Sequence, residues 1–257
     1  MPLQNTLLQD KVVLVVGATS GLGAGVARAA RAAGAKVVVG GRRRDKGEAI
    51  AAEVEGFFVR GDVARADEAA GMVTQTIAHH GRIDCLVNCA GLTTRGTLLD
   101  TTPELFDAHI AVNLKGPFFT MQAAVADMVG RSEPGTIVNV ISIDERGGQP
   151  FLTPYVAAKA GLAGLTRNAA HAHRWDRIRI NGLDIGWTET EGEAATQRKF
   201  HGADVDWAAQ AAEKLPMGKL GQVDEIAEFI VFLLSPRSGV VTGSVIDWDQ
   251  TVPGAYG

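Results

Sequence analysis

The chain has 257 residues, of which 46% are hydrophobic and 21% are charged. This balance excludes a disordered chain, a fibre and a coiled coil, and the length allows one or two domains. The 25 Lys and Arg residues against 29 Asp and Glu residues give a net charge of −4, which excludes a broadly cationic surface for nucleic acid or anionic membrane. No apolar run reaches the roughly 18 residues of a membrane span, and the first ten residues lack the pattern of a signal peptide. We therefore expect a soluble, cytoplasmic protein.

The predicted elements alternate along the chain. Val12–Val16 is a continuous apolar run that predicts a buried strand, and a helix over 22–33 follows it and ends before Gly34. The same alternation then predicts strands at 37–39, 57–59, 83–87, 136–141, 178–183 and 245–246. Helices are predicted at 45–54 and 66–79, in a long region before residue 136, from about Pro154 to Trp175, and at 223–234.

Alternating strands and helices indicate right-handed βαβ units, and therefore a parallel sheet with helices on both faces. The chain contains no repeat, low-complexity tract or linker, so we predict one domain over residues 1–257. The least regular stretch is about 186–220, and a long loop in a compact domain is typical of a binding loop. The two cysteines, Cys85 and Cys89, are too few for a disulfide framework or a zinc site, and no metal-ligand cluster is visible, so we predict no metal.

A glycine-rich loop follows the first predicted strand. It has the spacing G-x-x-x-G-x-G, with glycines at Gly17, Gly21 and Gly23, and it opens the first helix. Glycines at such a turn let backbone N–H groups approach a pyrophosphate, and the helix N-terminus adds a partial positive charge. The loop therefore predicts a nucleotide site.

Tyr155 and Lys159 lie four residues apart in a predicted helix and so share one face. An ammonium beside a phenol favours the phenolate, so the pair could exchange a proton with an alcohol or a carbonyl near neutral pH. Ser142 ends a predicted central strand, at the edge where open α/β sheets bind ligands and where the glycine loop also lies.

With these motifs in order, the chain resembles the short-chain dehydrogenase/reductase family over about residues 8–249. The resemblance rests on the glycine loop, Asp62, the run Asn88-Cys89-Ala90-Gly91, Asn113, and the spacing of thirteen residues from Ser142 to Tyr155. It implies a Rossmann-like, doubly wound α/β fold with about seven parallel strands. It also implies a homotetramer, or a homodimer, whose interface includes the helices around 113–126 and 155–175.

The resemblance implies hydride transfer between a nicotinamide cofactor and an alcohol or ketone. Tyr155 would be the general acid/base, Lys159 would lower the Tyr155 pKa, Ser142 would bind the substrate oxygen, and Asn113 would hold a water in a proton relay. The cofactor contacts it implies are Gly17, Thr19, Ser20, Gly21, Leu22, Gly23, Asp62, Val63, Asn88, Ala90, Gly91, Tyr155, Lys159, Gly186, Thr188 and Thr190.

The second predicted strand ends at Gly41, where family members that bind NAD usually carry an aspartate for the ribose 2′-hydroxyl. The arginines at 42–44 follow, and a guanidinium suits a 2′-phosphate. We therefore favour NADP over NAD, with Arg42 as the contact, although an arginine run can also be a solvated face.

The substrate is less well defined by the sequence. The segment 143–149 is more polar than is usual in the family, and the loop 187–191 is also polar and acidic. Together these favour a sugar, polyol or other small hydroxylated substrate, with Gln149, Phe151 and Trp187 as candidate contacts. The acidic residues in these segments could equally point to water. Two alternatives stay open: a catalytically silent dinucleotide-binding sensor or scaffold, and an epimerase or dehydratase that recycles its cofactor in place.

Overall fold

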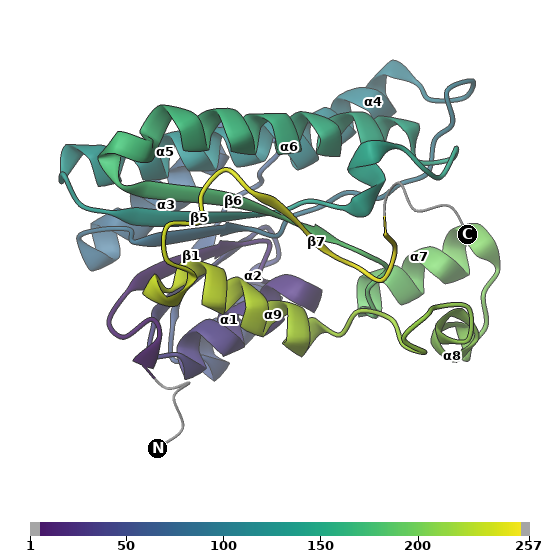
Figure 1. The fold of residues 1–257 in the computed structure, drawn as a ribbon, viewed down its shortest axis with the longest axis horizontal. Helices are drawn as coiled ribbons and strands as arrows, with labels where there is room; N and C mark the ends of the chain where they lie inside the picture. Colours follow the sequence, from purple (N-terminus) through teal and green to yellow (C-terminus); the bar gives the residue numbers. More distant parts are fainter. Residues whose placement is uncertain (1–5, 253–257) are drawn as a thin grey trace.

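Seven parallel strands form one sheet in the computed structural model, which describes residues 6–252. The strand order is β3-β2-β1-β4-β5-β6-β7 (Figure 1). The strands are β1 (Val12–Val16), β2 (Lys36–Gly41), β3 (Phe57–Arg60), β4 (Cys85–Asn88), β5 (Gly135–Val140), β6 (Ile178–Ile185) and β7 (Val245–Trp248). The predicted doubly wound α/β fold is confirmed.

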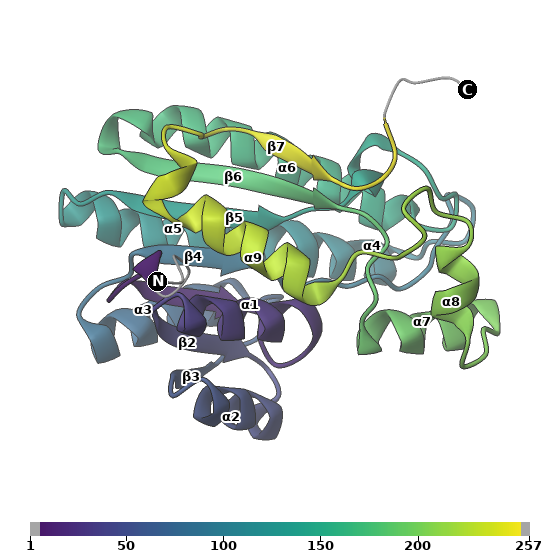
Figure 2. The same ribbon diagram turned by 60° about the horizontal axis from the view of Figure 1, so that its bottom comes forward.

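Helices cover both faces of this sheet (Figures 1 and 2). One face carries α1 (Gly21–Ala32), α2 (Arg44–Glu53) and α9 (Val223–Leu234). The other face carries α3 (Ala66–His80), α5 (Gly116–Gly130) and α6 (Thr153–His173), with α4 (Pro103–Ile110) packed against α6. Beyond the carboxyl ends of the strands lie two short helices, α7 (Glu191–His201) and α8 (Trp207–Ala212).

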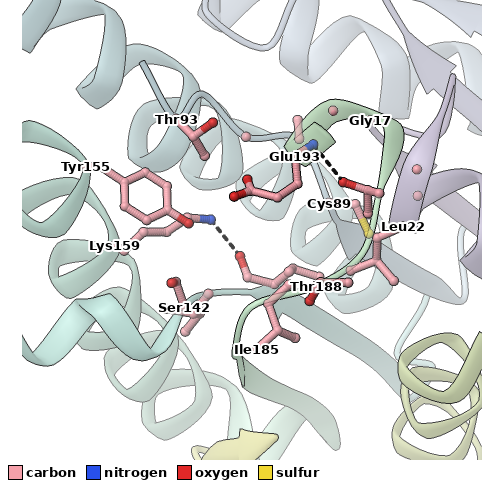
Figure 3. A pocket seen from close by; sticks show the side chains of 18 of the residues that line it. Gly17, Leu22, Cys89, Thr93, Ser142, Tyr155, Lys159, Ile185, Thr188 and Glu193 are labelled. Atoms are coloured by element: carbon pink, nitrogen blue, oxygen red, sulfur yellow. Dashed lines mark hydrogen bonds between the residues drawn. The ribbon is translucent and has the colours of Figure 1, made fainter. Parts of the chain in front are cut away.

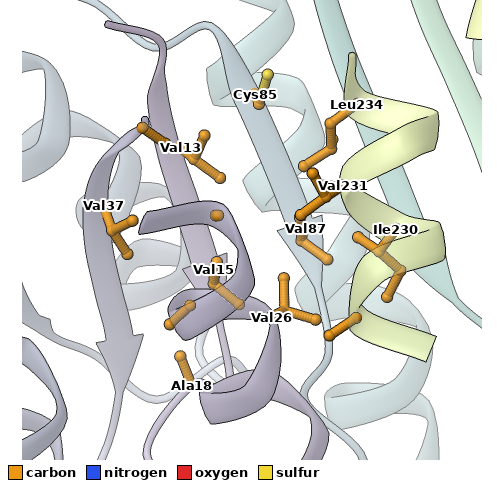
Figure 4. Close-up of a cluster of buried hydrophobic side chains, with 14 of the residues drawn as sticks. Val13, Val15, Ala18, Val26, Val37, Cys85, Val87, Ile230, Val231 and Leu234 are labelled. Atoms are coloured by element: carbon orange, nitrogen blue, oxygen red, sulfur yellow. The ribbon is translucent and has the colours of Figure 1, made fainter. Parts of the chain in front are cut away.

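The central strands are buried on both sides because successive side chains point to opposite faces of a sheet. Val13 and Val15 of β1 pack toward α1 and α9, against Val26 and Ile230 among others (Figure 4). The neighbouring Leu14 points the other way, into the layer formed by α3 and α5. The continuous apolar run of β1 thus builds two cores at once.

Strand β4 begins later than the sequence predicts. The prediction starts the strand at Ile83, whereas the ladder begins at Cys85. The backbone of Asp84 already hydrogen-bonds to both neighbouring strands: its N–H donates to the Val12 carbonyl and its carbonyl accepts from the Thr136 N–H, each at 3.0 Å. Its buried carboxylate, which accepts from the Val12 N–H at 2.9 Å and pairs with Arg82, adds a further link to the start of β1.

The sheet reverses its strand order between β1 and β4, the two strands from which the chain winds outward in opposite directions. Connections on either side of such a point leave in opposite directions, which opens a crevice at the carboxyl ends of the strands. The glycine loop follows β1, and Ser142 comes just after β5, so both lie at this edge.

Two predicted regions differ in detail from the structure. The long helical region before residue 136 divides into α4, a π-helical segment η2 (Ala111–Lys115) and α5. The stretch 186–220, predicted as irregular, carries the helices α7 and α8. Its small core of Trp207, Ala211 and Leu220 is separate from the cores on the sheet.

Candidate active site

A cleft of about 770 Å³ lies at the carboxyl edge of the sheet. The glycine loop lines one end of it, and Ser142, Tyr155 and Lys159 line the other. In Figure 3 these three side chains lie together on one side of the cleft, and Glu193 of α7 projects toward them from the opposite side. The fold therefore brings the two predicted motifs into one continuous cavity.

The glycine loop is too tightly packed for larger residues. Gly17 has a φ of +89°, and a Cβ on it would lie 2.5 Å from the backbone nitrogen of Ala90. A Cβ on Gly23 would lie 2.4 Å from the carbonyl oxygen of Gly17. Both contacts are shorter than van der Waals packing allows, so the loop depends on glycine at these two positions.

The N-terminus of α1 faces the same end of the cleft without a side-chain cap. Ser20 is the N-cap residue, but its hydroxyl makes no capping hydrogen bond, and the first turn contains no acidic residue. The free N–H groups and the helix dipole therefore suit an anion such as a pyrophosphate. The residues present fit the dinucleotide that the sequence predicts.

The three arginines that follow β2, at positions 42–44, make different contacts. Arg43 reaches back over the glycine loop, donating to Thr19 Oγ1 at 2.6 Å and to Ser20 Oγ at 2.7 Å. Arg42 is exposed and pairs with Asp62 at 3.5 Å, while Arg44 pairs with Glu48 on the surface of α2. Arg42 and Arg43 line the cleft, and Arg43 is the more firmly held of the two.

Helix α6 begins with Pro154 in its first turn, as predicted, and presents Tyr155 and Lys159 on one face. The Lys159 Nζ lies 5.6 Å from the centroid of the Tyr155 ring and donates to the carbonyl oxygen of Val140 at 2.8 Å. Ser142 stands at the end of β5, where its hydroxyl oxygen accepts from the Asp144 N–H at 3.3 Å. The end of β5 thus positions both the lysine and the serine.

Burial sets the protonation of this pair. It raises the pKa of the Tyr155 phenol above its ordinary value, an effect that the Ser142 hydroxyl opposes. It lowers the pKa of Lys159 to about 8. Desolvation is the largest influence on Tyr155, and it favours a protonated phenol at neutral pH. That Lys159 lowers the Tyr155 pKa stays a prediction.

Asn113 lies in the π-helical segment η2 and is fully buried. Its Oδ1 accepts from the Leu92 N–H at 2.9 Å and its Nδ2 donates to the Leu92 carbonyl at 3.0 Å. The Nδ2 also lies 3.2 Å from Nδ1 of His109, whose Nε2 lies 2.9 Å from the carbonyl of Thr94. Asn113 and His109 therefore fix the backbone that runs into the cleft after Gly91.

Most predicted site residues line the cleft. Besides the catalytic trio, these are Gly17, Thr19, Ser20, Gly21, Leu22, Gly23, Arg42, Asp62, Val63, Ala90, Gly91, Gln149, Gly186, Trp187, Thr188 and Thr190.

Three predicted residues lie elsewhere. Asn88 joins Asn139 and Thr120 in a buried hydrogen-bonded network between β4, β5 and α5. Asn113 is buried behind the loop that it fixes, and Phe151 stands behind Arg95, whose guanidinium lies 5.1 Å from the centre of its ring. All three support the cleft from outside its lining.

The structure also brings in residues that the sequence argument did not select. Among these, Arg95, Asp144, Glu193 and His201 line the end of the cleft near Tyr155. Burial raises the pKa of Asp144, which stands two residues after Ser142. The polarity of the segment 143–149 was a signal for Asp144, whereas no local pattern marks Arg95.

Thr190 connects the cofactor end of the cleft to α7. It is the N-cap residue of that helix, accepting from the Glu193 N–H at 3.0 Å, and its side chain lies 3.8 Å from a Cβ built on Gly21. The Glu193 carboxylate in turn accepts from Trp187 Nε1 at 2.9 Å and from Gln197 Nε2 at 2.7 Å. Helix α7 therefore closes over both ends of the cleft.

Three other features bear on function. Within residues 6–252, no group of three or more His, Cys, Asp or Glu side chains has the arrangement of a metal site. None of the helices in that part of the chain has the length and apolar character needed to cross a membrane. Burial raises the pKa of both cysteine thiols to about 12, so neither is a thiolate at neutral pH.

The chain matches known oxidoreductases along nearly its whole length. A family profile described as enoyl-(acyl carrier protein) reductase matches residues 17–250. An uncharacterized oxidoreductase from Thermotoga maritima is 36% identical over 94% of this chain and 96% of its own length. The 3-oxoacyl-(acyl-carrier-protein) reductase FabG of the same organism is 34% identical over 94% of this chain and 97% of its own.

Another relative acts on a sugar. The L-rhamnose 1-dehydrogenase (NAD(P)(+)) of Azotobacter vinelandii is 34% identical over 93% of this chain and 94% of its own length. Among solved structures, a candidate short-chain alcohol dehydrogenase from Sinorhizobium meliloti superimposes with a TM-score of 0.86 at 32% identity, covering 95% of this chain and 96% of its own. The fold of that structure is therefore shared along nearly the whole chain.

Proposed function

The chain belongs to the short-chain dehydrogenase/reductase family of oxidoreductases, and from this premise we propose that it interconverts a secondary alcohol and a ketone with a nicotinamide cofactor. The observation that carries the proposal is that Ser142, Tyr155 and Lys159 share one cleft with the glycine loop. A dinucleotide on that loop would extend along the cleft toward these three side chains. The cofactor would supply or accept the hydride.

The protein's own residues would handle the proton and the substrate oxygen. The Ser142 hydroxyl donates a hydrogen bond to the substrate oxygen and stabilises the negative charge that develops there during reduction. The buried Tyr155 phenol is protonated at neutral pH and donates its proton to that oxygen. Oxidation of an alcohol requires the reverse transfer, to a phenolate, which a protonated Lys159 stabilises.

We propose NADP as the preferred cofactor. Three residues that line the cleft would hold its adenosine end: Asp62 would contact the adenine, while Arg43 and the more exposed Arg42 would bind the 2′-phosphate. Gly41 supports this assignment, because a Cβ there would lie 2.6 Å from the Thr19 side chain, which leaves little room for the aspartate that NAD enzymes use. The guanidinium of Arg43, already fixed by two hydroxyls, suits a phosphate.

The substrate proposed is a small hydroxylated compound such as a sugar or polyol, and the segment 186–220 is its binding loop within a single domain. Charged and amide side chains at the end of the cleft near Tyr155 support this class, since they match hydroxyl groups better than an alkyl chain. The relative that dehydrogenates L-rhamnose is consistent with it. We further propose a homotetramer, in which the partly exposed Phe106 and Phe118 would be covered.

The proposal is tested by Tyr155→Phe. Removing the hydroxyl while keeping the ring should lower turnover by at least about a hundredfold, because the proton donor is lost. Binding of NADPH, measured by fluorescence titration, should stay within about twofold, since only the reacting hydroxyl is removed. A variant that turns over at a rate near that of the wild type would exclude the assigned role.

Two other functions are separated by the same assays. A silent dinucleotide-binding sensor would bind NADPH but show no Tyr155-dependent turnover with any alcohol or ketone. An epimerase or dehydratase would form product without net change in cofactor absorbance at 340 nm.

A reductase of acyl thioesters is the candidate that the FabG relative favours. It would reduce acetoacetyl-coenzyme A more efficiently than any sugar or polyol is oxidised.

A further inference from the structure

Arg95 is a cation at the end of the cleft near Tyr155, the substrate end. Within residues 6–252 it forms no ion pair: its Nη1 donates to the Thr93 carbonyl at 3.1 Å and its Nη2 lies 3.2 Å from Nε2 of His201. Its Nε is buried and has no hydrogen-bond partner. Arg95 as a whole is half-buried and lines the cleft, so the rest of its guanidinium can be reached by a ligand. An unpaired donor and an unpaired charge are costly, which favours a partner that arrives from outside.

The backbone around Arg95 holds it in place. The next residue, Gly96, pairs with the loop before α6, donating to the Phe151 carbonyl at 2.9 Å and accepting from the Thr153 N–H at 3.1 Å. On the other side, Asn113 and His109 hold the preceding backbone at Leu92 and Thr94. Arg95 therefore enters the cleft from a segment fixed on both sides.

Aromatic rings hold the guanidinium itself. Its carbon lies 5.1 Å from the ring centre of Phe151 and 5.9 Å from that of Phe200 in α7. Aromatic faces stabilise a cation without neutralising it or occupying its hydrogen-bond donors. The guanidinium is thus positioned while its charge stays available.

Two carboxyl groups act on Tyr155 at this end of the cleft, those of Asp144 and Glu193, and they limit how much negative charge a ligand can bring; Asp249 also lines the cleft. Glu193 is held by Trp187 and Gln197, and Asp144 stands beside Ser142. The positive charge of Arg95 opposes the rise in pKa that burial causes at both Asp144 and Tyr155, so these groups interact electrostatically. A ligand with a single negative charge is matched by one guanidinium, whereas a dianionic phosphate would be repelled by the two acids.

We propose that Arg95 is a specificity-determining residue that binds the carboxylate of a hydroxylated acid, so that the substrate is a hydroxy or keto acid of sugar-like polarity. This inference rests on the proposed function, because it places the reacting carbon of the same substrate at Ser142 and Tyr155. A guanidinium binds a carboxylate through two parallel hydrogen bonds, which would fix the substrate's orientation. Because Phe200 and His201 belong to α7, binding at Arg95 would also hold that helix over the substrate.

Matched pairs of probes test the proposal. D-gluconate is compared with D-glucitol, D-galactonate with galactitol, and 3-hydroxybutanoate with its methyl ester, each with NADP⁺ and NAD⁺. We measure kcat/KM for turnover and, by calorimetry, Kd for binding to the enzyme with NADPH bound. The variants are Arg95→Gln, Arg95→Lys, and Arg198→Gln, which removes an exposed arginine on α7 outside the cleft.

The expected result is a preference of at least about tenfold for the best carboxylate over its neutral partner, as a charged hydrogen bond provides. The preference should fall to about one in Arg95→Gln, survive in part in Arg95→Lys, and remain in full in Arg198→Gln. Because Arg95 also contacts α7, the measured quantity is the ratio within each pair and not the absolute rate.

Three outcomes would overturn the proposal: neutral probes bind better than carboxylates, the preference survives Arg95→Gln, or D-glucitol 6-phosphate binds more tightly than D-gluconate. Tyr155-dependent oxidation of neutral polyols alone would leave the proposed function standing without the carboxylate site. Arg95-dependent binding of carboxylates with no turnover would do the opposite. The two failures are therefore distinguishable.

Discussion

The two ends of the cleft are built in different ways. The cofactor end is formed mostly by backbone atoms: Gly17 and Gly23 pack against main-chain atoms, and the N-terminus of α1 has no side-chain cap. At the substrate end, the lining consists of charged side chains such as Arg95, Asp144 and Glu193, which come from three separate segments. A site made of backbone tolerates little change, whereas a site made of side chains can change its ligand by single substitutions.

The largest effect is expected from breaking the cofactor end. Gly17→Ala should weaken NADPH binding by at least about a hundredfold, because it combines a positive φ with a clash against Ala90. Gly21→Ala should cost less, since its φ is also positive at +54° but a Cβ there meets nothing closer than 3.8 Å. Fluorescence titration and Tm measure the two effects separately.

The matched control is Gly71→Ala in α3, where a Cβ would meet no atom within 4 Å. This change should leave NADPH binding unaltered and raise stability slightly, because alanine favours a helix. If Gly17→Ala and Gly71→Ala bound NADPH equally well, the loop would not depend on glycine. If Gly17→Ala failed to fold, Gly21→Ala would still report on the loop.

A smaller effect on NADPH binding is expected from Arg43, a side chain at the cofactor end of the cleft. Arg43→Ala should weaken NADPH binding by about tenfold or more while changing NADH binding little, since only NADPH carries the 2′-phosphate. Arg44→Ala removes a surface ion pair with Glu48 and should change neither. Equal losses for NADPH and NADH would show that Arg43 merely holds the glycine loop.

The smallest expected effect is on thermal stability, and it comes from the buried carboxyl group of Asp184. Asp184 of β6 is fully buried, its Oδ1 has no partner, and burial raises its pKa to about 7. The folded protein therefore binds more protons than the unfolded chain, whose carboxyl has a pKa of about 4, and loses stability as pH rises from about 4 to about 7. Asp184→Asn should raise Tm at pH 8 by about 2–4 °C, equivalent to about 1 kcal/mol.

The gain in Asp184→Asn should shrink below about pH 5, where the wild-type carboxyl is already protonated. Asp247→Asn serves as the control, because it removes a more exposed carboxylate that Arg146 pairs with besides those of Asp184 and Glu145. A lower Tm for Asp184→Asn at pH 8 would mean that the ion pair with Arg146 outweighs the cost of burial.

The contrast between the two ends also explains what could be predicted from the sequence. The glycine loop and the Tyr155–Lys159 pair are local patterns, and the fold places both where the patterns imply. Arg95 contacts the ring of Phe151 and His201 of α7, residues that lie 56 and 106 positions away in the chain. Such contacts exist only after folding, so nothing near Arg95 in the sequence marks it.

Element boundaries are predicted less well than element types. The start of β4 differs from the prediction by two residues, although Asp84 already hydrogen-bonds to Val12 through both its backbone and its carboxylate. The π-helical segment at 111–115 has no distinguishing composition, yet it sets the position of Asn113. Similarly, the sequence pattern does not predict α7, which lies in a polar stretch. None of its residues is fully buried, so no apolar stripe marks it as a helix.

The absence of fully buried residues in α7 separates two quantities that often change together: the stability of the fold and the rate at which ligands leave. A helix with no fully buried residue contributes little to the free energy of unfolding, and its opening costs far less than disruption of the sheet. Ligands could therefore enter and leave past α7 while the rest of the fold stays intact. In this protein, resistance to heat would be determined by the sheet and its two cores, and the rate of product release by α7, so evolution or engineering could alter either one alone.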